Sequence, residues 1–281
     1  MTSQVLRRRA QSDSQPVLSV KNLSVSFSRR RSKVVAVNDI SIEVWPGEIV
    51  GIIGESGSGK SMTALSVMRL LPHGAHTTGE IIIDGNDISK LTENQMRSLR
   101  GDRVAMIPQD ALQSLNPSLR VGYQIGEPLT LHDKVPPQGL RAKVRSLMEA
   151  VSIPRPDQNA KAWPHQFSGG MQQRAMIATG LALEPRLIIA DEPTTALDVT
   201  VQAGILDLLR KIRDDSGSGI MFITHDLGVV AELCDYVYVM NKGLVVEQGP
   251  VETILTTPQD PYTQMLLDAT PSIDDPRKVR A

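Results

Sequence analysis

A glycine-rich segment, Gly54–Ser61, has the residue types and spacing of a phosphate-binding loop. Lys60 would reach the β- and γ-phosphates of ATP, and the Ser61 hydroxyl would be a ligand of Mg²⁺. A plain Gly/Ser turn is the alternative, but the segment lies between a predicted buried strand and a predicted helix, which favours the phosphate site. With the neighbouring Met62, the predicted cofactor-binding residues are Gly54, Glu55, Ser56, Gly57, Ser58, Gly59, Lys60, Ser61 and Met62.

Two adjacent carboxylates follow a second apolar run, Leu187–Ala190. A carboxylate at the C-terminal end of a buried parallel strand points into the crevice where open sheets bind ligands. Asp191 would hold Mg²⁺ through its water shell, and Glu192 would orient or deprotonate an attacking water. An Asp-Glu pair alone is more often a solvated turn, so the functional interpretation depends on the phosphate loop upstream.

A second candidate anion site opens another predicted helix, at Phe167–Arg174. Ser168 can cap this helix, and Gly169 and Gly170 allow a backbone to approach an anion. This motif lies 108 residues beyond Lys60, in what we expect to be a different lobe. Standing alone, it would be interpreted as an ordinary N-cap.

The elements that must position these residues alternate between strands and helices, which predicts an α/β fold with a mainly parallel sheet. Half-buried antiparallel strands are expected at Leu18–Phe27 and Val34–Val44. A further strand is expected at Gly79–Asp84, followed by a hairpin turn at Gly85-Asn86. The predicted parallel strands are Glu48–Ile53, Val104–Ile107, Leu187–Ala190, Ile220–Thr224 and Tyr236–Met240, and helices are predicted at Gly59–Leu71 and Val199–Arg213.

Three further regions complete the predicted organisation. Residues 1–16 form a polar tail expected to be flexible, and residues 17–256 form the nucleotide-binding domain. A helical lobe at about 110–183, with a proline-rich break at Pro154–Pro164, is inserted into that domain. Residues 257–281 form an extension in which Asp260-Pro261 starts a helix, with Tyr262, Met265 and Leu266 as its apolar face.

The composition of the chain argues against several classes of protein. The net charge of −1 over 281 residues gives no global reason to expect nucleic acid as the partner. Two basic clusters, Arg7–Arg9 and Arg29–Arg31 with Lys33, are expected to be solvated, with anionic lipid as the alternative. Cys234, the single cysteine, excludes an internal disulfide and favours a small core residue. No apolar run approaches the roughly 20 residues that cross a bilayer, and no signal peptide is evident, so a cytoplasmic protein is expected.

Taken together, the motifs resemble those of the ATP-binding cassette (ABC) ATPases, from about Leu18 to Pro271. Ser168–Met171 is similar to their signature sequence, although Phe167 and Met171 replace the commonest Leu and Gln. Thr195–Asp198 resembles the D-loop. The resemblance implies a P-loop NTPase (RecA-like) fold with an antiparallel β subdomain and an inserted helical subdomain. It also implies that the signature of one subunit closes over ATP held by the phosphate loop of another.

The same resemblance implies roles for three more residues. Gln109 matches the Q-loop glutamine, which coordinates Mg²⁺ or the water at a hinge between lobes. His225 matches the switch histidine, which would hydrogen-bond the γ-phosphate and position the water of Glu192. Phe27 occupies the stretch of the adenine-stacking aromatic, although it could equally be strand core.

Two segments, Gln109–Pro117 and Pro258–Thr263, resemble the oligopeptide/dipeptide/nickel importer ATPases. The runs Gly59–Met62, Gly169–Arg174 and Asp191–Thr195 are similar to the first of the two ATPase subunits of such importers. The implied cofactors are ATP and Mg²⁺. The implied partners are a second ATPase subunit (a paralogue or a second copy), two transmembrane permeases and an extracytoplasmic solute-binding protein, at the cytoplasmic face of the inner membrane. Many such ATPases carry a C-terminal cysteine cluster, which this sequence lacks, so no iron–sulfur cluster is expected.

Several alternatives stay open. The cargo could be peptide, nickel, opine or sugar, with peptide favoured by the resemblance. A cassette protein acting on ribosomes or DNA usually has two cassettes or long coiled-coil insertions, and neither is present. A GTPase switch needs Asn-Lys-x-Asp, and Asn241–Leu244 lacks the final acid. A binding-only regulatory subunit is disfavoured because every catalytic position is intact.

Overall fold

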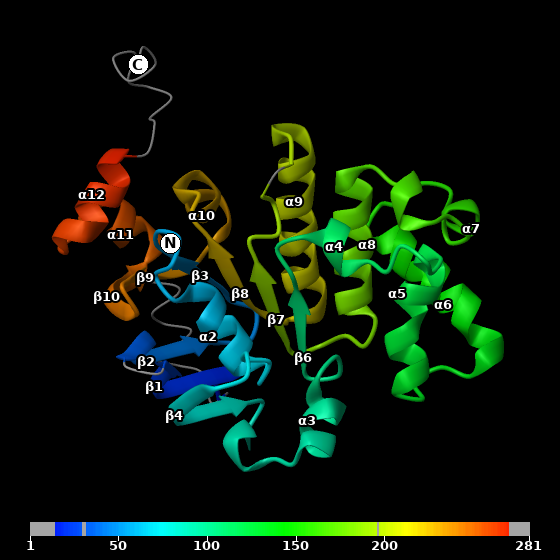
Figure 1. Cartoon of the computed structure of the whole chain (residues 1–281). Coiled ribbons are helices and arrows are strands. Elements are labelled where there is room, and N and C mark those ends of the chain that lie inside the picture. The colour runs from blue at the N-terminus through cyan, green and yellow to red at the C-terminus, as the bar shows by residue number, and fades with distance from the viewer. Residues whose placement is uncertain (1–14, 30–31, 196, 270–281) are drawn as a thin grey trace.

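The computed structural model of this chain describes residues 15–29, 32–195 and 197–269, and combines two β-sheets with a group of helices (Figure 1). The predictions for the tail at 1–14, the basic cluster Arg7–Arg9, Arg30 and Arg31, and residues 270–281 lie outside the described residues. Across the described part of the chain, no helix is both long enough and apolar enough to span a membrane.

The smaller sheet is antiparallel, with the strand order β2-β1-β4-β5. Its strands are β1 (Leu18–Arg29), β2 (Ser32–Val44), β4 (Ala75–Ile83) and β5 (Asn86–Asp87). The hairpin turn between β4 and β5 lies at Asp84-Gly85, one residue earlier than predicted, because both residues take positive φ angles of 46° and 79°. Positive φ at both central residues is the geometry that matches the twist of hairpin strands.

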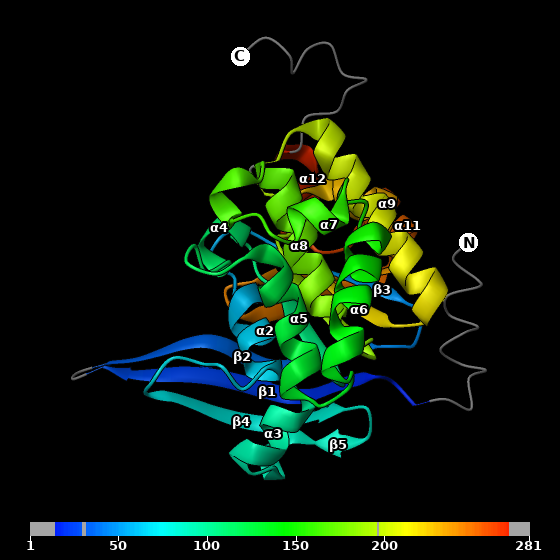
Figure 2. The ribbon, with the colours of Figure 1, turned by 90° about the vertical axis from the view of Figure 1, so that its right-hand side faces the viewer.

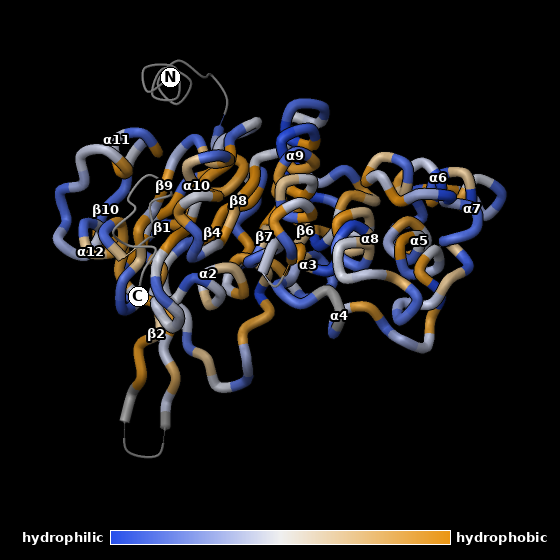
Figure 3. Tube along the Cα trace, turned by 90° about the horizontal axis from the view of Figure 1, so that it is seen from above, coloured by the Kyte–Doolittle hydropathy of each residue, from blue (hydrophilic) through white to orange (hydrophobic). Residues whose placement is uncertain are grey.

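The larger sheet contains the five predicted parallel strands and one further strand, β10, in the order β10-β9-β3-β8-β7-β6. These are β3 (Ile49–Ile53), β6 (Val104–Ile107), β7 (Leu187–Asp191), β8 (Gly219–Thr224), β9 (Tyr236–Asn241) and β10 (Leu244–Pro250). β10 alone among them pairs antiparallel, with β9. Every residue of β3, β7 and β8 is buried, as expected for strands covered on both faces. Figure 3 shows hydrophobic residues concentrated along this sheet.

Several helices connect the strands along the chain, and two more follow the last strand (Figure 1). They are α2 (Lys60–Val67), α3 (Glu93–Leu99), α9 (Val199–Ser216), α10 (Leu227–Leu233), α11 (Val251–Thr256) and α12 (Pro261–Ala269), with a 3₁₀ turn, η1, at Ile88–Lys90. α2 is shorter than the predicted Gly59–Leu71. Arg69 takes a φ of 50°, and Leu70 N–H donates to the Leu65 carbonyl at 2.8 Å, which closes the helix in a Schellman-type cap.

Between Ala111 and Leu181, the middle of the chain forms helices joined by loops. It contains α4 (Ala111–Ser114), α5 (Val121–Leu131), α6 (Pro137–Ala150), α7 (Pro156–Asn159), the 3₁₀ turn η2 (Pro164–Gln166) and α8 (Gly169–Leu181). Viewed from the side of these helices, β1, β2 and β4 lie below them (Figure 2). One apolar cluster joins α5, α6 and α8 to β3, β7 and β8, so the helical group shares its core with the larger sheet.

The C-terminal helix α12 corrects one prediction. Tyr262 and Leu266 pack against the main apolar cluster as expected, but the third residue that packs is Leu267. Met265 is 49 % exposed instead. The helix therefore presents a slightly rotated face to the protein.

Candidate functional site

The phosphate loop connects the end of β3 to the start of α2, as the motif predicts. Gly59 has a φ of 107°, and a Cβ on it would lie 2.6 Å from the Ala36 carbonyl oxygen. Gly54 has a φ of 147°, and a Cβ there would collide with the Met240 carbonyl oxygen. Both positions therefore require glycine for backbone conformation and for space.

Lys60 is buried and faces the backbone of its own loop. Its ammonium group donates hydrogen bonds to the carbonyl oxygens of Gly54 at 2.7 Å and Glu55 at 3.0 Å. Burial lowers the pKa of Lys60, while the nearby carboxylates of Glu192 and Asp191 act in the opposite direction. The Lys60 ammonium therefore lies against the backbone of the loop that would bind phosphate.

Two of the three predicted magnesium ligands, Ser61 and Asp191, are in contact, whereas the third, Gln109, contacts Glu192. The Ser61 hydroxyl donates to Asp191 Oδ1 at 3.3 Å, and Asp191 is 5 % exposed. Burial raises the pKa of Asp191, the Ser61 hydrogen bond lowers it, and the Glu192 charge raises it further. A buried carboxylate beside a hydroxyl matches the oxygen ligands that Mg²⁺ prefers, so these residues fit the metal.

Glu192 is the centre of a polar network drawn from three neighbouring strands. Gln109, beyond the end of β6, donates from Nε2 to Glu192 Oε2 at 3.1 Å. His225, beyond the end of β8, has its Nδ1 3.3 Å from Glu192 Oε1. The parallel order β6-β7-β8 places these strand ends side by side. The structure therefore brings together Gln109, Glu192 and His225.

One contact in this network was not predicted from the sequence. The Thr195 hydroxyl donates to Glu192 Oε2 at 3.0 Å. Thr195 was placed in the D-loop segment, but no role was predicted for its side chain. Its position three residues after Glu192, in a turn closed by a Thr195 N–H to Glu192 carbonyl bond of 3.2 Å, is the signal that could have revealed it.

A cavity of about 240 Å³ lies over the loop. It is lined by Ala36, Ser56, Gly57, Gly59, Lys60, Ser61, Met62, Gln109 and Glu192. Phe27, the candidate adenine-stacking residue, is not among the lining residues. Phe27 is half-buried in β1 and packs against the core of the smaller sheet, whereas Ala36 on β2 reaches the cavity without having been predicted.

The signature-like segment forms no part of this cavity lining. Ser168 caps α8, and its hydroxyl oxygen accepts from Met171 N–H at 3.4 Å. Gly170 packs against α9, since a Cβ on it would lie 2.6 Å from Val201 Cγ1. Ser168, Gly169 and Gly170 are therefore grouped at one helix start, apart from the residues that line the phosphate-loop cavity.

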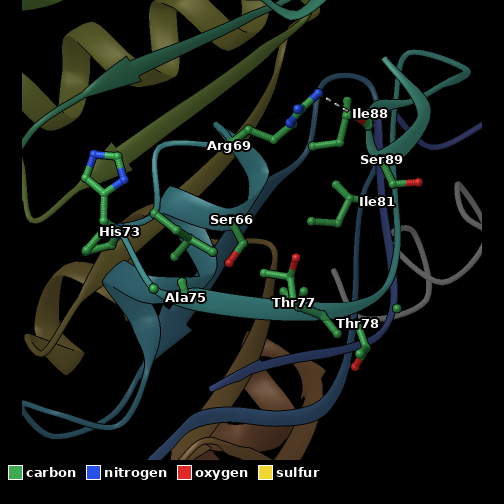
Figure 4. A pocket seen from close by; sticks show the side chains of 14 residues that line it. Ser66, Arg69, His73, Ala75, Thr77, Thr78, Ile81, Ile88 and Ser89 are labelled. Carbon is green, nitrogen blue, oxygen red and sulfur yellow. Dashed lines mark hydrogen bonds between the residues drawn. The ribbon is translucent and has the colours of Figure 1, made fainter. Parts of the chain in front are cut away.

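A second cavity, of about 570 Å³, lies between α2, β4 and η1 (Figure 4). Its most basic lining residue, Arg69, already donates to the carbonyl oxygens of Ile88 at 3.1 Å and Leu91 at 2.8 Å. None of the candidate catalytic residues lines it. The larger volume therefore does not mark the reaction site.

Comparison with known families agrees with the phosphate-loop geometry. Residues 37–195 match the family model described as "ABC transporter", and residues 246–281 match the model "Oligopeptide/dipeptide transporter, C-terminal region". The first match spans more than half of the chain. The chain therefore belongs to the ABC transporter family, and its resemblance to this family is confirmed.

Curated relatives support the same branch. The chain is 47 % identical over 268 residues to the peptidoglycan transport ATP-binding protein YejF of Agrobacterium fabrum, covering 95 % of this chain and 49 % of that protein. It is 45 % identical over 260 residues to the oligopeptide transport ATP-binding protein OppD of Bacillus subtilis, covering 92 % and 73 %. It is 47 % identical over 260 residues to the dipeptide transport ATP-binding protein DppD of the same organism, covering 92 % and 78 %.

Solved structures confirm the predicted α/β fold class. The ATP-binding cassette MJ0796, in a dimeric post-hydrolysis state bound to ADP and Pi, superposes with a TM-score of 0.74 at 26 % identity. That match covers 83 % of this chain and 98 % of MJ0796. A cassette from Clostridium perfringens, cbiO1, gives the same TM-score and covers 87 % of this chain and 92 % of its own.

Proposed function

We propose that the chain is the ATP-hydrolysing subunit of a membrane importer, most simply a peptide importer, in which ATP binding and hydrolysis drive solute uptake. The observation that carries this proposal is the group of Gln109, Thr195 and His225 side chains around Glu192, beside Lys60 and the Ser61–Asp191 pair. Such a group has the components of phosphoryl transfer to water: a phosphate cradle, a cation, metal ligands and a carboxylate that orients the nucleophile.

ATP binding would exchange the contacts of Lys60. The ammonium leaves the carbonyl oxygens of Gly54 and Glu55 and bonds the β- and γ-phosphates, while loop N–H groups bind the remaining phosphate oxygens. Ser61 and Asp191 would hold Mg²⁺, which neutralises charge on the phosphates. Glu192 orients and deprotonates the attacking water, Gln109 senses the γ-phosphate, and His225 positions both water and phosphate.

The signature segment completes the site from a facing cassette. Ser168, with Gly169 and Gly170, caps the γ-phosphate of ATP held by the other subunit, which explains why one chain carries two half-sites. The dimeric state of the solved relative MJ0796 supports this arrangement. The second ATPase subunit is a paralogue or a second copy, and the assembly sits on two permeases at the cytoplasmic face of the membrane, supplied by a solute-binding protein.

The peptide cargo is supported by the names of the relatives OppD and DppD and by the C-terminal family match. Nickel, opine or another small solute are the alternatives within the same branch. We keep Phe27 as the proposed adenine-stacking residue, because it is half-buried near the C-terminal end of β1. ATP and Mg²⁺ are the proposed cofactors.

The decisive experiment is the Glu192→Gln variant. We expect it to bind ATP with normal affinity and to lose phosphate release by at least about 100-fold, since general-base catalysis contributes roughly 10²–10⁴-fold. Nucleotide binding and phosphate release would be measured with and without Mg²⁺. A matched control is Glu184→Gln, which removes an exposed carboxylate that pairs with Lys143 at 2.9 Å, outside the site. Retained turnover in Glu192→Gln would remove Glu192 from the role of base.

A further inference from the structure

The C-terminal helix α12 contacts the phosphate loop directly. The Tyr262 hydroxyl oxygen accepts a hydrogen bond from the Glu55 N–H at 3.1 Å, across 207 residues of sequence. Glu55 is the second residue of the loop, so an element outside the match to the cassette model, which ends at residue 195, contacts the proposed ATP site. Figure 1 shows α12 beyond α11, at the outer end of the larger sheet.

Hydrogen bonds fix the start of this helix to the larger sheet. The Glu247 carboxylate on β10 accepts from the N–H groups of Gln259 at 2.8 Å and Asp260 at 3.2 Å. The Asp260 carboxylate in turn accepts from Tyr262 N–H at 2.8 Å. The next residue, Thr263, is 1 % exposed. These contacts fix the backbone at Tyr262, and the Tyr262 side chain packs against the main apolar cluster, so the direction of its hydroxyl is restrained.

α12 also forms one wall of a cavity behind the loop. Leu266 and Ala269 line a space of about 500 Å³ together with Ile53, Gly54, Glu55, His225, Asp226 and Leu227. The opposite wall thus contains the first two residues of the phosphate loop and the candidate switch histidine. The helix is therefore placed where its position can influence the loop.

The Glu55 residue is held from two sides. Its N–H donates to the Tyr262 hydroxyl, and its carbonyl oxygen accepts from the Lys60 ammonium at 3.0 Å and from the Ser58 N–H of the same loop at 3.2 Å. In the proposed function, Lys60 leaves that carbonyl oxygen when it bonds the phosphates of ATP. The bond from the Glu55 N–H to the Tyr262 hydroxyl and the Ser58 bond then remain, and of these two only the bond to Tyr262 ties Glu55 to an element outside the loop.

We infer that Tyr262 is a positioning residue of the ATP site: it holds the Glu55 end of the phosphate loop in its binding shape while Lys60 transfers from the loop to the phosphates. This inference rests on the proposed function. It makes the C-terminal extension part of the nucleotide site. The loop would depend on Tyr262 more strongly with ATP bound than without it.

The test is Tyr262→Phe in the full chain, which removes one oxygen and keeps the ring. We expect the Kd for ATP to rise about two- to twelve-fold, as for one lost hydrogen bond. Hydrogen exchange at the Glu55 amide should accelerate by a similar factor, and most clearly in the ATP-bound protein. The thermal midpoint of the nucleotide-free protein serves to detect a general loss of structure.

Tyr238→Phe is the matched control. The hydroxyl of Tyr238, on β9 of the larger sheet, accepts from the N–H of Glu43, on β2 of the smaller sheet, at 3.0 Å. This is the same kind of hydrogen bond. This variant should keep the wild-type Kd for ATP and the wild-type exchange at Glu55. Equal ATP affinity and equal Glu55 exchange in Tyr262→Phe and wild type would overturn the inference. Failure of the wild-type chain to bind ATP would instead overturn the proposed function.

Discussion

The two half-sites of this cassette use the same residue types for different physical reasons. In the phosphate loop, Gly54, Gly57 and Gly59 have φ angles of 147°, 81° and 107°, so glycine is required by backbone conformation. In the signature segment, Gly170 is the second residue of α8 and has no such φ. Glycine is required there by space, because a Cβ would lie 2.6 Å from Val201 Cγ1.

The polar contacts differ in the same way. Around the phosphate loop, several contacts form within one chain: Lys60 bonds the Gly54 carbonyl oxygen, Ser61 bonds Asp191, and Gln109 and His225 contact Glu192. For the Ser168 hydroxyl, the structure gives a 3.4 Å bond to the N–H of its own helix. The phosphate-loop site is therefore assembled by folding, whereas the signature segment is a helix start whose proposed ligand would be held by a facing cassette. Three changes to the chain test this difference.

The largest effect is expected from Lys60→Ala. ATP affinity should fall by about 100-fold or more, since each charge-assisted bond to phosphate contributes roughly 1.5–3 kcal/mol. Titration with a fluorescent nucleotide measures it. Lys90→Ala is the control, because Lys90 has a 79 % exposed side chain and pairs with Asp87 far from the loop. Affinity within about three-fold of wild type in Lys60→Ala would mean that phosphate binds without this ammonium.

Ser168→Ala separates the half-sites. The isolated chain should keep its ATP affinity, because Ser168 does not line the cavity over its own phosphate loop. Turnover by the assembled transporter should fall about 10- to 100-fold through the lost phosphate contact. Thr92→Ala removes a comparable helix cap at α3, where Thr92 and Gln95 form a capping box, and should leave turnover unchanged. Loss of ATP affinity in the isolated Ser168→Ala chain would mean that Ser168 acts on the nucleotide bound to its own phosphate loop, against the proposed arrangement.

The sequence was most informative where one chemical need determines a local pattern. The phosphate loop and the buried strands β3, β7 and β8 were predicted, because positive-φ glycines and fully buried parallel strands leave strong local signals. The convergence of Gln109, Glu192 and His225 depends on the order of the strands in the sheet, which no local pattern contains. The roles of Gln109 and His225 came from the family resemblance.

Other features depend on contacts that no local pattern contains. β10 was not predicted, since its half-exposed residues follow no clean alternation and its pairing with β9 fixes it. The end of α2 was missed because Arg69, not a glycine, takes the left-handed conformation. Ala36 reaches the cavity, and Met265 faces solvent, only through the packing of whole elements.

The smallest expected effect concerns stability and comes from Gly170→Ala. The added Cβ would be forced against Val201, so the free energy of unfolding should fall by about 1–3 kcal/mol. Gly169→Ala is the matched control one residue earlier, where a Cβ would lie 3.8 Å from Leu197 Cδ2. It should be neutral or stabilising by up to about 1 kcal/mol through helix propensity. Urea unfolding of both variants measures the difference.

A second substitution decides whether packing is the cause. Val201→Ala shortens the side chain that the new Cβ of Gly170→Ala would strike. The double variant should therefore lose less free energy of unfolding than the sum of the two single losses. Additive losses, or equal stability of Gly170→Ala and Gly169→Ala, would show that α8 and α9 are not in tight contact there. Packing against α9 would then no longer explain the signature glycine, and the contrast drawn between the two segments would lose its physical basis.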